Sequence, residues 1–380
     1  MNYDAATAEL LQQGMRVFQG AMLAPTEAEH CERLFELFRP RGTVVDMGCG
    51  VGEVCGHFVR LAPELNCIGV TNNSAQAYLA ADAPLSVVLA DMAATGLEGG
   101  CADTVMFNES FGYGRPRALL AEAFRLLKPG GRLCIKDFSV ARPDPSIAAA
   151  EAAWDDTVHE PEALALYAEL AGFKPVRVHR RIPADLSRWL EFMGSYSLAD
   201  QHRHEPQGAN LAAAVYVFEK PDAAPAPRRP TLAEALKGDA DAIRFCNTLH
   251  RVLHTWDDVV DGDAPAEAAI NAAFRAALVD IPLNPFFARH AAVLCPVLAA
   301  GITAWTAANE LERGPDREAW RKAHMLRVHV GAVFVLCAEL VGGYEWGVLM
   351  APYLYDQVQG DALATYMNEL EEKHARAHRV

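Results

Sequence analysis

The sequence predicts an α/β domain built on a parallel sheet, followed by a second, all-α helical domain. Two observations predict the first domain: short apolar runs alternate with helix-like segments, and a glycine-rich turn, Gly48–Gly52, directly follows the first run. A third predicts the second domain, because the composition changes to alanine, leucine and charged residues at helical spacing after a proline-rich stretch. We therefore divide the chain into residues 1–220, a semi-rigid linker at 221–230, and residues 231–380.

The first predicted strand begins at Thr43 and ends in an acidic residue, Asp46, just before Gly48, Gly50 and Gly52. Glycine suits such a turn because a ligand can then approach the backbone closely. A G-x-G-x-G run is a weak signal by itself. Here it lies between a strand pattern and a helix pattern, which favours a ligand site at the end of this strand.

Further strands are expected along the chain, most of them ending in polar residues. They cover residues 67–71, 85–91, 102–110 and 211–219, and the stretch 126–137 reads as a helix end, a Pro-Gly-Gly turn and a strand. Ligands bind at the carboxyl ends of the strands of such a sheet. Residues 1–40 are expected to form helices that cap it.

In this pattern, residues 41–220 resemble the class I S-adenosylmethionine-dependent methyltransferases. That family has a glycine loop after strand one, polar residues after strands two to four, and an L-x-P-G-G turn before strand five, here L-K-P-G-G. A nicotinamide-binding Rossmann domain also has glycine after strand one, but the L-K-P-G-G turn and the acid after strand three have no place in it.

The resemblance implies which residues hold S-adenosylmethionine. Asp46 and the loop Gly48, Cys49, Gly50 and Gly52 would hold its methionine part, and Asp91 and Met92 would flank its adenine. Asn108, Glu109 and Ser110 would face the sulfonium and the substrate.

One departure from the family pattern concerns the acceptor. The usual Asp or Glu that contacts the ribose after strand two is replaced by T-N-N-S-A-Q, which begins at Thr71 and Asn72. This run and N-E-S at 108–110 resemble the branch that methylates sterols, tocopherols and prenyl diphosphates on carbon. The resemblance implies a small, largely apolar acceptor, with a prenyl diphosphate as one candidate.

Methylation of an alkene carbon would leave a carbocation, which aromatic faces can stabilise, and then a proton for a base to remove. The candidate bases are Glu109 first and His159 second. Candidate aromatic walls are Phe111, Tyr113, Trp154, Trp189, Phe192 and Tyr196. Each of these side chains also has a simpler interpretation. Glu109 could accept a hydrogen bond from the amino group of the cofactor, His159 could be a loop residue, and Trp189 and Phe192 could belong to the core.

The helical domain has one informative segment, 245–263. His250, His254, Asp257, Asp258 and Asp261 recur every three or four positions, which places them along one face of a helix. Burying these carboxylates and histidines beside core residues costs free energy unless an opposite charge compensates them. Mg²⁺ or another divalent metal would supply that charge.

Asp257–Asp261 also resembles the D-D-x-x-D motif of terpene synthases and prenyltransferases, which implies magnesium held against a diphosphate. Their second metal motifs are not found, and about 150 residues is roughly half the usual length of that fold. A small helical metal site with ligands from a partner helix (Glu310, Glu312, His324, His329 or Glu339) is a second reading. A solvated acidic helix end is the third.

Composition narrows the remaining choices. A net charge of −15 argues against a nucleic-acid partner. The apolar runs at 295–308 and 330–343 fall short of a membrane span, and the first residues lack the features of a signal peptide. Nine cysteines without C-x-x-C spacing indicate reduced core thiols and a cytoplasmic protein.

We therefore expect a methyltransferase that uses S-adenosylmethionine on an apolar acceptor. Two alternatives remain for the helical domain. It is a metal-dependent phosphohydrolase coupled to the methyltransferase, or it serves only oligomerisation, as in a homo-oligomer, or partner docking.

Overall fold

A computed structural model covers the whole chain. The structure describes all residues except 1–6, 9–10, 13, 18, 143–146, 149–150, 152–155, 183–210, 224–227, 360–362 and 378–380. Four predicted aromatic walls, Trp154, Trp189, Phe192 and Tyr196, lie outside the described residues. The chain divides into two compact units, Met1–Arg228 and Arg229–Val380.

The first unit is built on a seven-stranded sheet with the order β3-β2-β1-β4-β5-β7-β6. The strands are β1 (Thr43–Met47), β2 (Asn66–Thr71), β3 (Ser86–Leu89), β4 (Ala102–Asn108), β5 (Leu127–Val140), β6 (Lys174–Ile182) and β7 (Leu211–Glu219). Strands β1 to β5 pair in parallel, whereas β7 runs antiparallel to both β5 and β6. The predicted Rossmann-like α/β fold is confirmed.

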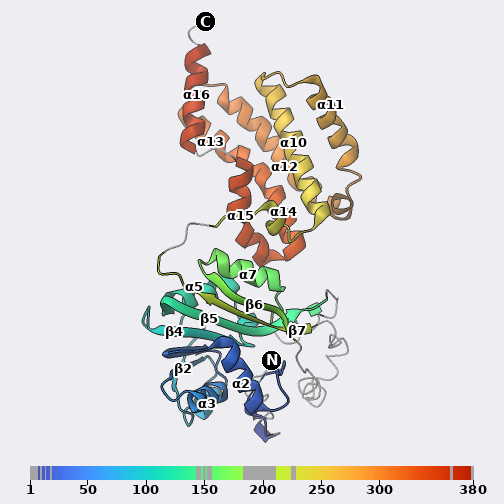
Figure 1. The fold of residues 1–380 in the computed structure, drawn as a ribbon. Coiled ribbons are helices and arrows are strands. Elements are labelled where there is room, and N and C mark those ends of the chain that lie inside the picture. Colours follow the sequence, from blue (N-terminus) through green and yellow to red (C-terminus); the bar gives the residue numbers. More distant parts are fainter. Residues whose placement is uncertain are drawn as a thin grey trace. The chain divides into compact units, whose positions relative to one another are not determined.

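Helices cover both faces of this sheet, with α2 (Glu27–Phe38) and α3 (Glu53–Leu61) on one side and α5 (Pro116–Leu126) and α7 (Pro161–Leu170) on the other (Figure 1). Local signals set where they begin. Thr26 and Glu29 form a capping box on α2, and Pro116 and Pro161 occupy the first positions of α5 and α7.

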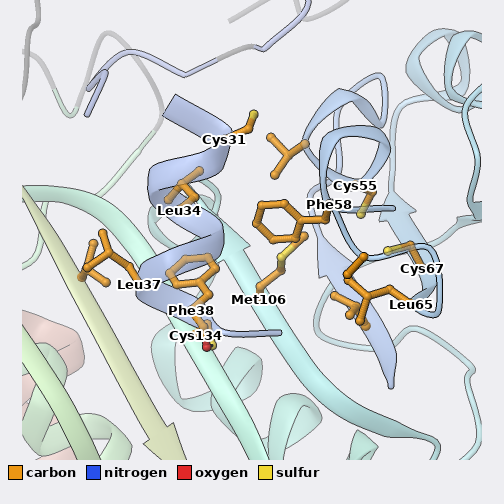
Figure 2. Close-up of a cluster of buried hydrophobic side chains, with 14 of the residues drawn as sticks. Cys31, Leu34, Leu37, Phe38, Cys55, Phe58, Leu65, Cys67, Met106 and Cys134 are labelled. Atoms are coloured by element: carbon orange, nitrogen blue, oxygen red, sulfur yellow. The ribbon is translucent and has the colours of Figure 1, made fainter. Parts of the chain in front are cut away.

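The core on the α2–α3 face is drawn in Figure 2. Phe38 of α2 and Phe58 of α3 pack over Met106 of β4 and Cys134 of β5, all of them completely buried. In parallel register Met106 pairs with Cys134 and with Asp46, so these three side chains share one face of the sheet. The same register places Asn108 and Lys136 on that face, one step nearer the carboxyl ends.

The strands differ from the predictions chiefly at β3 and β5, and the sequence pattern does not predict β6. β3 ends at Leu89, because Asp91 belongs to a turn in which Ala93 N–H donates to its side chain at 2.7 Å. The Pro-Gly-Gly segment lies within the long strand β5, where the pairing with β4 shifts between Ala102 and Thr104.

The second unit is all-α in its described residues. Its helices are α9 (Leu232–Ala235), α10 (Ala240–Asp261), α11 (Glu267–Arg275) with a π-helical extension η2 (Ala276–Asp280), α12 (Pro285–Glu312), α13 (Arg317–Arg327), α14 (Gly331–Gly342), α15 (Tyr344–Gln359) and α16 (Leu363–Ala377). Asp239 caps the start of α10 and Gly262, in a left-handed conformation, ends it.

The sequence alone suggests one amphipathic helix near residues 317–340, but a short 3₁₀ turn, η3 (Val328–Val330), separates α13 from α14. At this turn Val330 packs on Gly301 of α12, and the ring of Tyr355 lies against Gly331. Two helical stretches, Pro285–Glu312 and Arg317–Gly342, are long and apolar enough to cross a membrane by length and composition, a test that core helices also pass. The expectation of no membrane span therefore stays a prediction.

All nine cysteines are free thiols, and seven of them are buried. Burial raises the pKa of the Cys31 and Cys134 thiols to about 12, which disfavours their thiolate forms. These thiols behave as small apolar groups, as the sequence suggests.

Candidate cofactor and acceptor site

The glycine loop between β1 and α3 has the backbone that only glycine adopts easily. Gly48, Gly50 and Gly52 have φ values of 80°, 55° and 80°. The amides of Gly48 and Cys49 both donate to the Val70 carbonyl of β2, at 2.8 and 2.9 Å. A Cβ added at Gly48 would lie 2.6 Å from Ser110 Cβ, so this loop passes close to the end of β4.

Asp46, at the end of β1, is a buried carboxyl group with unused hydrogen-bonding capacity. Its side chain is 2 % exposed, Cys55 Sγ–H donates to Oδ2 at 3.4 Å, and Oδ1 has no partner among the described residues. Burial raises its pKa to about 7. A ligand that offers a positive charge or a donor here would relieve this cost.

Asn108, at the end of β4, shows the same property. It is 8 % exposed, and within the described part of the chain neither its Oδ1 nor its Nδ2 has a hydrogen-bond partner. A buried amide with both polar atoms unused is expected where a ligand binds. Next to it, Ser110 donates from Oγ to the Met47 carbonyl, which ties the end of β4 to the end of β1.

The residues after β2 and β3 complete this edge of the sheet. Thr71 Oγ1 donates to Gln76 Oε1 at 3.2 Å, and Asn73 Oδ1 accepts from the Gln76 amide at 2.8 Å as α4 (Ser74–Ala80) begins. Asn72 is exposed, as is Asp91. Met92 Sδ lies 3.3 Å from the position of a Cβ on Gly48, so the turn after β3 reaches the glycine loop.

These observations fit S-adenosylmethionine, which carries an ammonium group, a carboxylate and ribose hydroxyls. The unpartnered Asp46 oxygen can accept from the ammonium or a hydroxyl, and the Asn108 amide can both donate and accept. The ten predicted cofactor residues come from the ends of four neighbouring strands. Their individual roles stay predictions.

Glu109, predicted as the first candidate base, is fully engaged with the protein itself. Its carboxylate accepts from the amides of Gly20 and Ala21, the latter at 2.9 Å, and forms a buried ion pair with Lys136. Lone pairs occupied in this way are poorly placed to remove a proton from a substrate. The geometry therefore disfavours this role for Glu109.

The other predicted catalytic groups have mixed surroundings. Phe111 is completely buried, with its ring 5.2 Å from that of Phe107 and 5.6 Å from that of His159, so it is a core residue and not an open wall. His159 extends the sheet beside Ser139, and its ring lies edge-on to that of Tyr167 at 6.3 Å. Tyr113, in the short helix η1 (Phe111–Tyr113), is 38 % exposed.

Sequence reasoning missed a pair of buried carboxyl groups near the end of β5. Asp137 accepts from the amides of Phe111 and Phe138, at 3.0 and 2.8 Å, and burial raises its pKa to about 7. Asp156 lies against the backbone of Gly112, where a Cβ would overlap its Oδ1. Burial and the charge of Asp137 raise the pKa of Asp156 to about 8, and its Oδ1 has no partner among the residues described.

In the second unit, the predicted face of α10 is present but its carboxylates are already paired. Arg327 of α13 lies 3.3 Å from Asp257 Oδ1, donates to Glu312 Oε2 at 2.6 Å and stacks on Trp305 at 4.6 Å. Lys373 of α16 lies 3.5 Å from Asp261, and His254 lies 3.9 Å from Asp258.

Arg327 and Lys373 thus compensate the charges of Asp257 and Asp261. Across the described ranges, no group of three or more His, Cys, Asp or Glu side chains is arranged to hold a metal ion. The five residues expected as ligands, His250, His254, Asp257, Asp258 and Asp261, therefore do not form a metal centre in this structure. His250, His254, Asp257 and Asp261 instead line a cavity of about 520 Å³, together with Glu312, His324 and Arg327 among others.

A family model described as a methyltransferase domain matches residues 45–135, which include the glycine loop and the ends of β1 to β4. With the sheet and the site, this match defines the class: the chain carries a Rossmann-like, S-adenosylmethionine-dependent methyltransferase domain and is an enzyme. No curated protein matches the chain.

Several solved structures are similar to this chain at low identity. A geranyl diphosphate C-methyltransferase from Streptomyces coelicolor A3(2), in complex with Mg²⁺, geranyl diphosphate and S-adenosyl-L-homocysteine, is 17% identical, with 58% of this chain and 98% of that chain covered and a TM-score of 0.46. A geranyl diphosphate methyltransferase in complex with GPP and sinefungin is 20% identical over 51% of this chain and 79% of that chain, with a TM-score of 0.45. The [4+2]-cyclase SpnF is 17% identical over 57% and 94%, with a TM-score of 0.48.

Proposed function

We propose that this enzyme transfers a methyl group from S-adenosylmethionine to carbon of a small, largely apolar acceptor, with a prenyl diphosphate as the first candidate. The assignment of the cofactor is supported by two buried side chains beside the glycine loop, Asp46 and Asn108, which have polar atoms without partners among the described residues. The proposed class of methyl acceptor is supported by the runs 71–76 and 108–110, which resemble the carbon-methylating branch of the family.

The bound cofactor supplies an electrophilic methyl group on a positively charged sulfur. The contribution of the protein is to orient donor and acceptor for an in-line displacement. In our proposal Asp46 and the loop 48–52 bind the methionine part, Thr71 and Asn72 contact the ribose, Asp91 and Met92 flank the adenine, and Asn108 lies nearest the transferred methyl.

An alkene acceptor must lose a proton after its new carbon–carbon bond forms. We assign this step to the carboxyl pair Asp137 and Asp156 and not to Glu109. Asp156 Oδ1 has no partner in the described segments, and a carboxyl with a pKa of about 8 can exchange a proton near neutral pH. The electron pair of the broken C–H bond then restores the alkene, and the carboxylate keeps the proton.

Magnesium enters this proposal only as a partner of the diphosphate substrate. A diphosphate carries several negative charges, and Mg²⁺ is commonly bound through substrate phosphates with few protein ligands. The described residues offer no preformed group of metal ligands, so no step is assigned to a metal held by the protein.

The test is transfer of labelled methyl from S-adenosylmethionine to a panel of prenyl diphosphates, with Mg²⁺ and with a chelator. We expect label in an extractable prenyl product, reduced by the chelator and reduced at least about tenfold by Asp46→Asn when the cofactor is below saturation. Cofactor binding without label in any prenyl product would reject the acceptor class and keep the methyltransferase.

A further inference from the structure

Glu109 has a backbone conformation that the surrounding structure must enforce. Its φ is 52°, in the left-handed region that few residues other than glycine adopt. The Glu109 amide donates to the Lys136 carbonyl at 2.7 Å, and its carboxylate accepts from Gly20, from Ala21 and from Lys136 Nζ. These contacts hold a residue of the candidate site against a segment that lies 89 positions earlier in the chain.

The contacts continue as a buried polar network. Lys136, completely buried, also donates to Gln19 Oε1 at 3.1 Å, and Gln19 Oε1 lies 2.6 Å from His30 Nε2. Since the Leu23 amide donates to His30 Nδ1 at 2.9 Å, the network assigns the imidazole proton to Nε2. Gln19, His30, Glu109 and Lys136 are each more than nine-tenths buried, so the network joins β4, β5 and α2 to residues 19–23 without solvent.

This network lies at the edge of the sheet that carries the candidate cofactor residues. Glu109 stands between Asn108 and Ser110, and Lys136 shares a sheet face with Asn108. A second contact of the N-terminal region reaches the same edge, because Gln76 Nε2 donates to Thr7 Oγ1 at 3.1 Å while Gln76 also contacts Thr71. Asp46 and Asn108, the two cofactor candidates at this edge, are only 2 % and 8 % exposed.

We propose that Glu109 and Lys136 are positioning residues whose ion pair latches residues 19–23 over the cofactor edge, and that cofactor entry and release require this latch to open. The inference rests on the proposed function only for the identity of the cofactor. Two charged groups buried together hold a segment firmly as a pair, whereas one alone leaves an uncompensated buried charge. The double variant Glu109→Gln/Lys136→Met therefore tests the latch, because it removes both charges at once.

The experiment compares this double variant with wild type and with Asp103→Asn/Lys128→Met. The control removes another ion pair between β4 and β5, 2.7 Å long, at the opposite end of these strands. Amide hydrogen exchange is followed at residues 19–23 with and without S-adenosylmethionine, and the cofactor dissociation rate is measured by stopped flow. We expect exchange at Gly20 and Ala21 and cofactor dissociation to become at least about tenfold faster in the double variant only.

Unchanged exchange at residues 19–23 together with an unchanged dissociation rate would overturn the proposal. If the double variant does not fold, Gln19→Leu tests the same latch, because it detaches the segment from Lys136 and His30 and leaves the ion pair in place. If no form of the protein binds the cofactor, the proposed function fails, while exchange in the ligand-free protein still tests the latch.

Discussion

At the scale of single residues, the polar groups that lack partners mark the site more clearly than sequence motifs do. Asp46 and Asn108 are buried with unused hydrogen-bonding atoms, a property that the short motifs around them do not reveal. An unpaired buried polar atom costs about 1–3 kcal/mol, so a fold keeps it only where something recovers the cost. Binding of the cofactor is the recovery that we infer here.

Asp46→Asn is expected to separate binding from folding. Burial raises the pKa of Asp46 to about 7, so its folded form holds a proton that the unfolded chain releases above about pH 4. The resulting stability is present at low pH and falls as pH rises towards 7, by an amount on the order of 4 kcal/mol. At pH 8 the neutral amide should leave the ligand-free protein at least as stable as wild type.

In the same variant, cofactor affinity should drop about 10- to 100-fold, because a hydrogen bond to a charged group is lost. Calorimetric titration and thermal unfolding of one preparation measure both effects. An unchanged affinity would remove Asp46 from the cofactor site.

Asp156→Asn is expected to change the pH dependence of stability. The pKa values of Asp137 and Asp156 are raised to about 7 and about 8, so the stability they contribute is lost as pH rises from about 4 towards 8. In the variant, the melting temperature should depend less on pH between pH 5 and pH 8 than it does in wild type. With an alkene acceptor it should also slow turnover about 100-fold or more.

Asp82→Asn, at an exposed carboxyl, serves as the control and should alter neither profile. A steep pH dependence that survives in Asp156→Asn would show that other groups titrate.

At the scale of elements, the loop between β1 and α3 requires glycine at position 48 for two reasons, a left-handed backbone and a close neighbour. Their energetic costs can be measured separately. Gly48 has φ 80° and a Cβ there would lie 2.6 Å from Ser110 Cβ, whereas Gly96 has φ 72° and open space around it. Both Gly→Ala changes incur the cost of a left-handed residue, about 1–2 kcal/mol. Gly48→Ala should lower the free energy of unfolding by a further 1–3 kcal/mol or so, because the neighbouring side chain must move.

Urea denaturation of the two variants checks this difference. If both variants lose the same free energy of unfolding, Ser110 can move aside without an energetic cost. Its proximity would then not be the reason that position 48 is a glycine.

Helix α10 is present as the sequence predicts, whereas its metal site stays a prediction, because no metal-ligand group appears among the described residues. The periodicity of His250, His254, Asp257 and Asp261 places these residues on one face, and they do line one cavity. The partly buried carboxylate on this face does have a compensating charge, because Arg327, 70 positions away from Asp257, donates to it. The spacing within one helix contains no information about the helix that packs against it.

At the scale of the whole molecule, the division into Met1–Arg228 and Arg229–Val380 predicts that the cofactor site is independent of the second unit. All the residues assigned to that site lie in the first unit. We expect a fragment of residues 1–228 to bind S-adenosylmethionine with the affinity of the full chain, measured by calorimetric titration.

The full chain and a fragment of residues 229–380 are the controls, and the second fragment should be helical by circular dichroism without binding the cofactor. Loss of binding by a folded 1–228 fragment would mean that the second unit completes the site.

The sequence by itself determined strands β1 to β5 and β7, the glycine loop and the helical character of the second unit, although not strand β6 or the turn η3. These features follow from local rules: side-chain periodicity, capping residues and turns that need glycine act over a few positions. Only the tertiary structure decided that Glu109 holds Gly20 and Ala21, that Asp137 and Asp156 form a carboxyl pair, and that Arg327 pairs with Asp257 of α10. Each of these joins residues far apart in the chain, and packing and strand register, not local pattern, bring such residues together.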